Sequence, residues 1–197
     1  EQIQYATRVF IESLAEGDYK IIGLEVEIDG NVFGKELRGQ IDCLAKRPDG
    51  KQAIIDFKFG GHNKYIKMLE EGKAVQLATY AHSQRDAAGN YPAVAYLILA
   101  NGRFLTPTGS AIKGGDGLQT VDGPPISEVW DKFVKAIEKC GTWLTTDAKV
   151  PAWPLYPSTH WPKGVELVLQ DDLKIDESQT PCRYCDYTKL CGIQRLD

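Results

Sequence analysis

The feature that most constrains the fold of this 197-residue chain is a short apolar segment that carries two opposite charges. Residues 51–58, KQAIIDFK, have the composition of a β-strand and follow a strong turn signal at residues 47–50. Because side chains alternate between the two faces of a strand, Asp56 and Lys58 share one face with Ile54. A strand this apolar is expected at the centre of a sheet, where a charge without a partner is costly. The two side chains therefore form either a structural ion pair or part of a functional site.

A second carboxylate lies on the segment that precedes this strand. Residues 36–46, ELRGQIDCLAK, alternate in polarity as a strand does and place Asp42 on its polar face. If the two strands pair through a two-residue loop, residues whose numbers sum to roughly 97 lie opposite one another. Asp42 would then face Ile55 and lie about one residue away from Asp56. The two carboxylates are predicted to converge at one end of the sheet.

Two converging carboxylates suit a hard divalent cation such as Mg²⁺ or Mn²⁺. A lysine beside them can orient or deprotonate a water and neutralise charge that develops on a phosphate, while the metal supplies Lewis acidity. The formal net charge of −4 counts mildly against a nucleic-acid substrate, because DNA-binding domains usually carry a basic excess. Metal ions, however, neutralise acidic sites. The pattern predicts metal-dependent hydrolysis of phosphodiesters.

The remaining pattern predicts an α/β fold in which helices pack on a mixed central sheet, as one domain over residues 1–197. The first three strands are expected to form an antiparallel meander with a turn at residues 29–31. Helices are predicted over residues 3–16, 64–85 and 126–141, further strands over 21–29 and 92–100 with a hairpin to 102–106, and loop over 107–125.

Three short motifs, taken in order, resemble the RecB-like branch of the PD-(D/E)xK nuclease superfamily. They are G-x-x-D at Gly39–Asp42, I-I-D-F-K at Ile54–Lys58 and Q-x-x-x-Y at Gln76–Tyr80. The resemblance spans roughly residues 20–85 and resumes at 180–192. It implies a restriction-endonuclease-like fold with an irregular cysteine-bearing tail. It also implies a Mg²⁺- or Mn²⁺-dependent deoxyribonuclease, an exonuclease of recombination, repair or phage replication.

The same resemblance assigns roles to the residues of the first two motifs. Asp42 and Asp56 would be metal ligands, and the backbone carbonyl of Phe57 would be a third. Lys58 would be the catalytic lysine.

The resemblance also implies how the protein meets DNA. Gln76 and Tyr80 lie at i and i+4 on one helix face, beside the active site, where they would contact the substrate; without that context they would be an ordinary helix surface. Glu25 matches an acidic position on the preceding strand and is a further metal-ligand candidate, or it belongs to a solvated strand face. Lys64 and Lys73 are candidates for phosphate contacts, and solvated helix positions are the alternative.

Three cysteines near the C-terminus form a C-x₂-C-x₅-C pattern at Cys182, Cys185 and Cys191. Three thiolates at this spacing can hold a metal or cluster if a fourth ligand joins them. The tail at 180–192 resembles that of RecB-like nucleases with a [4Fe-4S] cluster, whose fourth cysteine lies far upstream and is not in this chain. Cys43 is a poor substitute because it faces away from Asp42. Zinc, or free or disulfide-linked thiols, are the alternatives. The odd cysteine count favours a reducing cytosol, and the resemblance implies the cytoplasm of a bacterium or of a phage-infected host.

The N-terminal helix lacks one feature of the family. RecB-like nucleases often carry a metal-binding histidine there, and no histidine precedes His62. The histidine and the fourth cysteine are expected to lie upstream of Glu1, or to be absent. If absent, the alternative function is a catalytically idle nuclease fold that binds DNA or a partner. A helicase or recombination protein is the expected partner. The sequence has no run of about 18 apolar residues, so no membrane-spanning helix is predicted.

Overall fold

The computed structural model of the chain describes residues 1–32, 34–110, 112 and 117–145. The chain divides into two compact units, residues 1–133 and 134–197. The first unit contains the whole sheet and three helices, and helix α4 (Ile126–Thr145) starts in it. No helix among the described residues is long and apolar enough to cross a membrane.

Six strands form one mixed sheet, in which spatial order follows chain order. The pairs β1–β2 and β2–β3 are antiparallel, as the predicted meander requires, while β3 and β4 are parallel. The pair β4–β5 is antiparallel and β5–β6 is parallel. The strands are β1 (Lys20–Val32), β2 (Lys35–Lys46), β3 (Gln52–Lys58), β4 (Ala93–Ile98), β5 (Arg103–Pro107) and β6 (Leu118–Val121). The predicted mixed α/β fold is confirmed.

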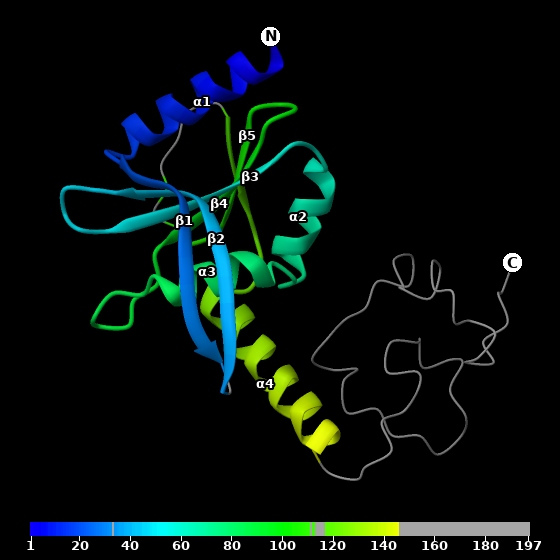
Figure 1. The fold of residues 1–197 in the computed structure, drawn as a ribbon. Helices are drawn as coiled ribbons and strands as arrows, with labels where there is room; N and C mark the ends of the chain where they lie inside the picture. The colour runs from blue at the N-terminus through cyan, green and yellow to red at the C-terminus, as the bar shows by residue number, and fades with distance from the viewer. Residues whose placement is uncertain (33, 111, 113–116, 146–197) are drawn as a thin grey trace, which may run out of the picture. The chain divides into compact units, whose positions relative to one another are not determined.

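Helices cover both faces of this sheet (Figure 1). On one face, Phe10 and Leu14 of α1 (Gln2–Glu16) pack in a core cluster with Ile55 of β3. On the other, α2 (His62–Glu70) and α3 (Val75–Ser83) pack in a cluster that includes Ile54. Because neighbouring residues of β3 are buried in opposite clusters, the strand is central, as its apolar sequence predicts.

The hairpin between β2 and β3 differs from the prediction by one residue. Cys43 lies opposite Ile55, so paired residue numbers sum to 98 rather than 97. The loop has three residues, 48–50, because Gly50 N–H donates to the carbonyl of Arg47 and Gly50 adopts a φ of 89°. This is a type I turn followed by a left-handed residue, which the Pro-Asp-Gly sequence favours over a two-residue loop. The shift moves Asp42 towards Asp56.

The single helix predicted over 64–85 is wrong, because the chain breaks between α2 and α3. Gly72 has a φ of 65°, its N–H donates to Leu69 O, and Lys73 N–H donates to Met68 O. These two bonds are a Schellman motif, which closes the carbonyl end of a helix. A Cβ at Gly72 would also lie 2.7 Å from Pro124 Cγ. Tertiary packing thus ends the helix where periodicity alone continues it.

Other parts of the structure also differ from the sequence prediction. The turn predicted at 29–31 falls later, between Val32 and Lys35, where Gly34 supplies a φ of 71°. The predicted loop over 107–125 contains the short strand β6. On β1, Leu24 is exposed, because the pairing with β2 shifts between Ile21 and Gly23 and Glu25 has a φ of 50°.

Candidate active site

The site opens where β2 and β3 separate. Their ladder ends with the pair Cys43 and Ile55. At the next position the Asp42 side chain replaces the backbone, since the N–H of Phe57 donates to Asp42 Oδ2 over 2.7 Å. The bond fixes one oxygen of Asp42 against β3 and places this carboxylate near Asp56.

Asp56 is a buried carboxylate, with 1% of its surface exposed. Its Oδ2 lies 2.5 Å from Lys58 Nζ, as the ion-pair interpretation predicts, while Oδ1 has no hydrogen-bond partner among the described residues. Burial raises the pKa of Asp56, the Lys58 ammonium opposes that shift, and the nearby charge of Asp42 adds to it. The environment therefore disfavours a second negative charge unless a cation joins the two carboxylates.

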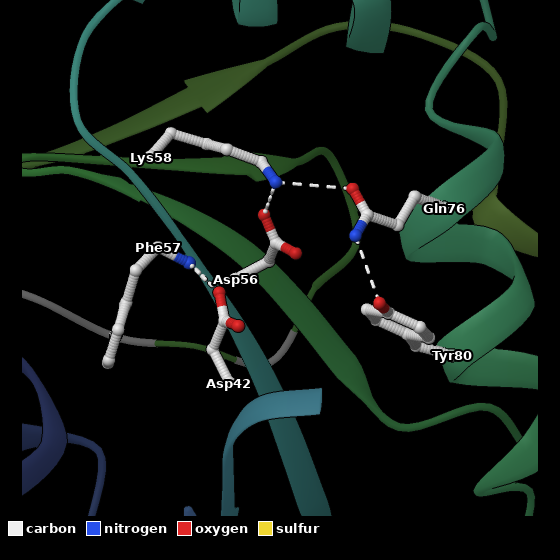
Figure 2. Close-up of polar contacts among 6 residues, drawn as sticks. All are labelled: Asp42, Asp56, Phe57, Lys58, Gln76 and Tyr80. Atoms are coloured by element: carbon white, nitrogen blue, oxygen red, sulfur yellow. Dashed lines mark hydrogen bonds and ion pairs between the residues drawn. The ribbon is translucent and has the colours of Figure 1, made fainter. Parts of the chain in front are cut away.

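Lys58 connects Asp56 to helix α3 (Figure 2). Its ammonium donates to Gln76 Oε1 over 3.2 Å, and Gln76 Nε2 donates to the Tyr80 hydroxyl over 2.9 Å. Burial disfavours the charged ammonium, but the ion pair with Asp56, helped by Tyr65 and Asp42, outweighs it and raises the pKa of Lys58. Lys58 is thus held protonated, 20% exposed, at the mouth of the site.

Gly39 explains how Tyr80 approaches the sheet. A Cβ at Gly39 would lie 3.1 Å from Tyr80 Cε1 and 3.1 Å from Ile28 Cγ1. Such contacts are tighter than side chains normally tolerate, so the absent side chain makes room for the tyrosine ring. The first residue of the G-x-x-D motif therefore contacts the last residue of Q-x-x-x-Y.

Two aromatic residues near the site are not predicted from the sequence. Tyr96 of β4 lies opposite Asp56 in the parallel pair, and its ring centroid is 4.8 Å from that of Tyr65. The Lys58 ammonium lies 5.9 Å from the centre of the Tyr65 ring. A tyrosine within the aliphatic run AVAYLI was the available signal for Tyr96; nothing in the sequence singles out Tyr65.

Three weaker candidates are exposed or paired with another residue. Glu25 is exposed on β1 and does not join Asp42 and Asp56 in a group of three ligands. Lys64 is exposed and lies 5.6 Å from the centre of the Tyr65 ring. Lys73 forms an ion pair with Glu71 over 2.7 Å, which neutralises part of its charge.

The donors present fit a divalent cation. Asp56 Oδ1 is a buried oxygen without a described partner, and Asp42 keeps one oxygen beyond its bond to the backbone. Oxygen donors of this kind are those that Mg²⁺ and Mn²⁺ prefer. Among the described residues, however, no third His, Cys, Asp or Glu side chain completes the group. Backbone carbonyls, water and substrate are the ligands left to complete it.

The predicted cluster ligands Cys182, Cys185 and Cys191 lie outside the described residues. Cys43 is fully buried in the core cluster under α1. Burial, with the neighbouring charge of Asp42, raises the pKa of Cys43 to about 11. Cys43 is a packed thiol, as expected because its side chain lies on the face of the strand that is opposite to Asp42.

Comparison with known proteins identifies the family. No curated protein matches the chain. The family described as the PD-(D/E)XK nuclease superfamily matches over residues 2–192, nearly the whole sequence. Nucleases of this superfamily typically use divalent metals, in agreement with the two carboxylates and the lysine on the central strands. The chain therefore belongs to the PD-(D/E)XK nuclease superfamily.

Proposed function

We propose that the protein is a Mg²⁺- or Mn²⁺-dependent DNA exonuclease of the RecB-like branch. The observation that carries this proposal is the buried Asp56 carboxylate. It is paired with Lys58, and the nearby negative charge of Asp42 raises its pKa further. A buried carboxylate with an oxygen that has no described partner is costly for a protein that does not use it. The order of Asp42, Asp56, Lys58, Gln76 and Tyr80 in the sequence supports the RecB-like assignment.

Each side chain has a defined task in this proposal. Asp42, Asp56 and the carbonyl of Phe57 would hold the cation, which would supply Lewis acidity at the phosphate. Lys58 presents a fixed positive charge to the phosphate and orients the attacking water. Gln76 holds the ammonium in place, and its amide reaches Tyr80.

Cleavage of labelled DNA tests the activity directly. The full chain, incubated with Mn²⁺ and end-labelled linear DNA, is expected to release nucleotides from the ends, while Asp56→Ala is expected to be inactive. A covalently closed circular substrate separates exonuclease from endonuclease activity, since an exonuclease leaves it intact. Glu12→Gln, an exposed change on α1, is the matched control. Equal cleavage by Asp56→Ala would falsify the site.

The iron–sulfur assignment is a second part of the proposal. We assign a [4Fe-4S] cluster, rather than zinc, to Cys182, Cys185 and Cys191, with a fourth ligand from outside the chain. Its role is structural, and the full-length protein is expected to be brown when purified without oxygen. Iron and zinc analysis decide between the metals, and a protein with neither metal rules out both.

An idle nuclease fold that binds DNA or a partner, such as a helicase or recombination protein, is the second candidate. It is favoured by the lack of a third acidic, His or Cys ligand among the described residues. It predicts that the full-length protein retards labelled DNA in a gel but leaves it uncut with Mg²⁺ or Mn²⁺. Mn²⁺-dependent cleavage that requires Asp56 excludes it.

A further inference from the structure

We infer that Tyr65 is a positioning residue for the proposed reaction, because its aromatic ring confines the Lys58 ammonium to the side of the Asp56 carboxylate. The inference rests on the proposed nuclease function, in which Lys58 presents its charge to the phosphate. Lys58 is the last residue of β3, and its ammonium ends a flexible aliphatic stem. Such a charge can serve the phosphate only if neighbouring groups restrict where it points.

Tyr65 lies on the face of the sheet that carries the candidate site. It packs against the core cluster that contains Ile54 and Tyr96. Ile54 lies two residues before Asp56 on β3, so the two side chains leave the same face of the strand. Tyr96 is the partner of Asp56 in the parallel pair of β3 and β4, and its ring centroid lies 4.8 Å from that of Tyr65. The Tyr65 ring is therefore held on the face from which Asp56 projects.

Two different helices contact the Lys58 ammonium. The ammonium lies over the Tyr65 ring of α2, 5.9 Å from the ring centroid. It also donates to Gln76 Oε1 of α3 over 3.2 Å (Figure 2). Its third neighbour is the Asp56 carboxylate, at 2.5 Å. An anion, an amide oxygen and an aromatic face thus surround one charge and leave it one preferred position.

The Tyr65 ring is expected to act on Lys58 more strongly than on Lys64. The Lys64 ammonium lies 5.6 Å from the ring centroid, but Lys64 is exposed, whereas the Lys58 side chain is 20% exposed. The attraction between a cation and an aromatic face is stronger when the cation is removed from water. The ring therefore favours the inward position of the Lys58 ammonium.

The start of α2 fixes the Tyr65 ring relative to the end of β3. The N–H of Tyr65 donates to Gly61 O over 3.1 Å. A Cβ at Gly61 would lie 3.4 Å from Tyr65 Cε2, so the ring packs against this part of the backbone. Gly61 belongs to the short segment that connects Lys58 to α2. The positions of the ring and of the lysine are therefore coupled through the chain as well as through space.

Two substitutions separate the aromatic face of Tyr65 from its bulk. Tyr65→Leu keeps an apolar side chain but removes the ring, and it is expected to lower kcat for a labelled oligonucleotide roughly 3- to 30-fold, with KM changed much less. Tyr65→Phe keeps the ring and is expected to retain kcat. The matched control is Tyr5→Leu, which removes from α1 a tyrosine ring that lies 5.4 Å from the Arg8 guanidinium carbon. This control is expected to leave kcat unchanged.

Two measurements without cleavage test where the Lys58 ammonium lies. The NMR signals of the Lys58 Cε hydrogens, assigned by their loss in Lys58→Met, are expected to be shifted upfield by the ring in wild type and in Tyr65→Phe. In Tyr65→Leu they are expected at the ordinary lysine position. In urea unfolding, the double variant of Tyr65→Leu and Lys58→Met is expected to be more stable than the sum of the two single losses predicts.

The outcomes separate this inference from the proposed function. If wild type cuts DNA and Tyr65→Leu changes neither kcat nor the Lys58 signals, the positioning role is wrong and the nuclease stands. If the two losses of stability add, Tyr65 only packs in the core, which also overturns the role. Equal losses of kcat in Tyr65→Phe and Tyr65→Leu would assign the effect to the hydroxyl and overturn the role of the ring. If Asp56→Ala cuts as well as wild type, the proposed function fails, and the NMR and unfolding measurements still decide whether Tyr65 holds the ammonium.

Discussion

The Lys58 side chain contacts several residues of the candidate site. Its ammonium is shared between the Asp56 carboxylate and the Gln76 amide oxygen, at 2.5 and 3.2 Å. Charge-assisted contacts of this kind hold a flexible side chain in one rotamer. Because Lys58 is bonded to Gln76, a shift of α3 would move the lysine. We therefore expect residues that position α3 to affect catalysis without touching DNA.

Gly39→Ala is predicted to disturb the site from a distance. The new Cβ would press on Tyr80 and Ile28, so we expect a loss of stability of about 1–3 kcal/mol and a fall in kcat of roughly 10- to 100-fold. Thermal unfolding and cleavage rates measure the two effects.

Gly30→Ala is the matched control for this substitution. It lies on the paired strand, and its Cβ would have ordinary contacts of 3.8 Å and 3.9 Å with Leu37. We expect its stability to stay within about 0.5 kcal/mol of wild type. Equal effects of the two substitutions on activity would show that Gly39 does not position Tyr80.

At this scale the sequence singles out the charged residues but not their surroundings. Asp56 and Lys58 on an apolar strand are conspicuous because burying charges is costly. The close approach of Gly39 to Tyr80 depends on how α3 lies on the sheet, which no local pattern encodes. The same holds for Tyr65, which reaches Lys58 only because α2 folds back over β3.

The elements around the site are held by a few backbone features rather than by long helices. The break between α2 and α3 lets the second helix point Gln76 and Tyr80 at β3, whereas the predicted continuous helix would run past it. Gly72 permits the break, and its neighbour Pro124 fills the space over it.

Gly72→Ala is predicted to destabilise the protein more than Gly89→Ala. Both residues have positive φ, so both substitutions carry a backbone cost of about 1–2 kcal/mol. Only Gly72 also meets a neighbour, Pro124 Cγ at 2.7 Å, while a Cβ at Gly89 meets nothing within 4 Å. Denaturant unfolding measures the difference, and equal losses would mean that the Pro124 contact is unimportant.

His82 links the end of α3 to α4 and predicts a pH dependence of stability. Its ring stacks on Trp130 with centroids 4.0 Å apart, its Nδ1 lies 3.0 Å from the Tyr91 hydroxyl, and Arg85 donates to Nε2 over 2.9 Å. Burial, followed by the charge of Arg85, lowers the pKa of His82, against the opposing charge of Asp131. The folded protein therefore prefers the neutral ring.

The direction of this pH dependence follows from proton binding. Below the ordinary histidine pKa of about 6.5 the unfolded chain binds more protons at this residue than the folded chain. The contribution of the neutral His82 ring to the free energy of unfolding is complete above about pH 7, and it is lost as the pH falls through the lowered pKa of His82. We expect His82→Phe, which keeps the stack, to flatten the fall in stability between pH 7 and 5. An unchanged slope in urea unfolding would rule out this role.

Element types were more predictable than element ends. Apolar periodicity marks α1, β2 and β3 because each has a single buried pattern. The strand β6 is four residues long and lies among glycines and prolines, so its pairing with β5 is decided by the tertiary fold. The loop 48–50 is one residue longer than predicted, because the same sequence allows two turn lengths.

At the scale of the molecule, binding of a cation is predicted to stabilise the fold. Mn²⁺ at a hundred times its dissociation constant should add about 2.7 kcal/mol, because the ion binds only the assembled carboxylates. The melting temperature is expected to rise with Mn²⁺, return to its starting value with a chelator, and stay constant in Asp56→Ala. An equal rise in Asp56→Ala would mean that the ion binds elsewhere.

The parallel pairing of β3 with β4 has a consequence for the timing of activity. Asp56 lies opposite Tyr96. The chain that connects β3 to β4 includes both α2 and α3. Pairing strands so far apart in the sequence is slow, because the intervening chain must be ordered first. A ribosome that has released residues 1–58 has produced both aspartates and the lysine, but not the strand that buries them. We expect the nascent chain to remain harmless to DNA until β4 has emerged and docked.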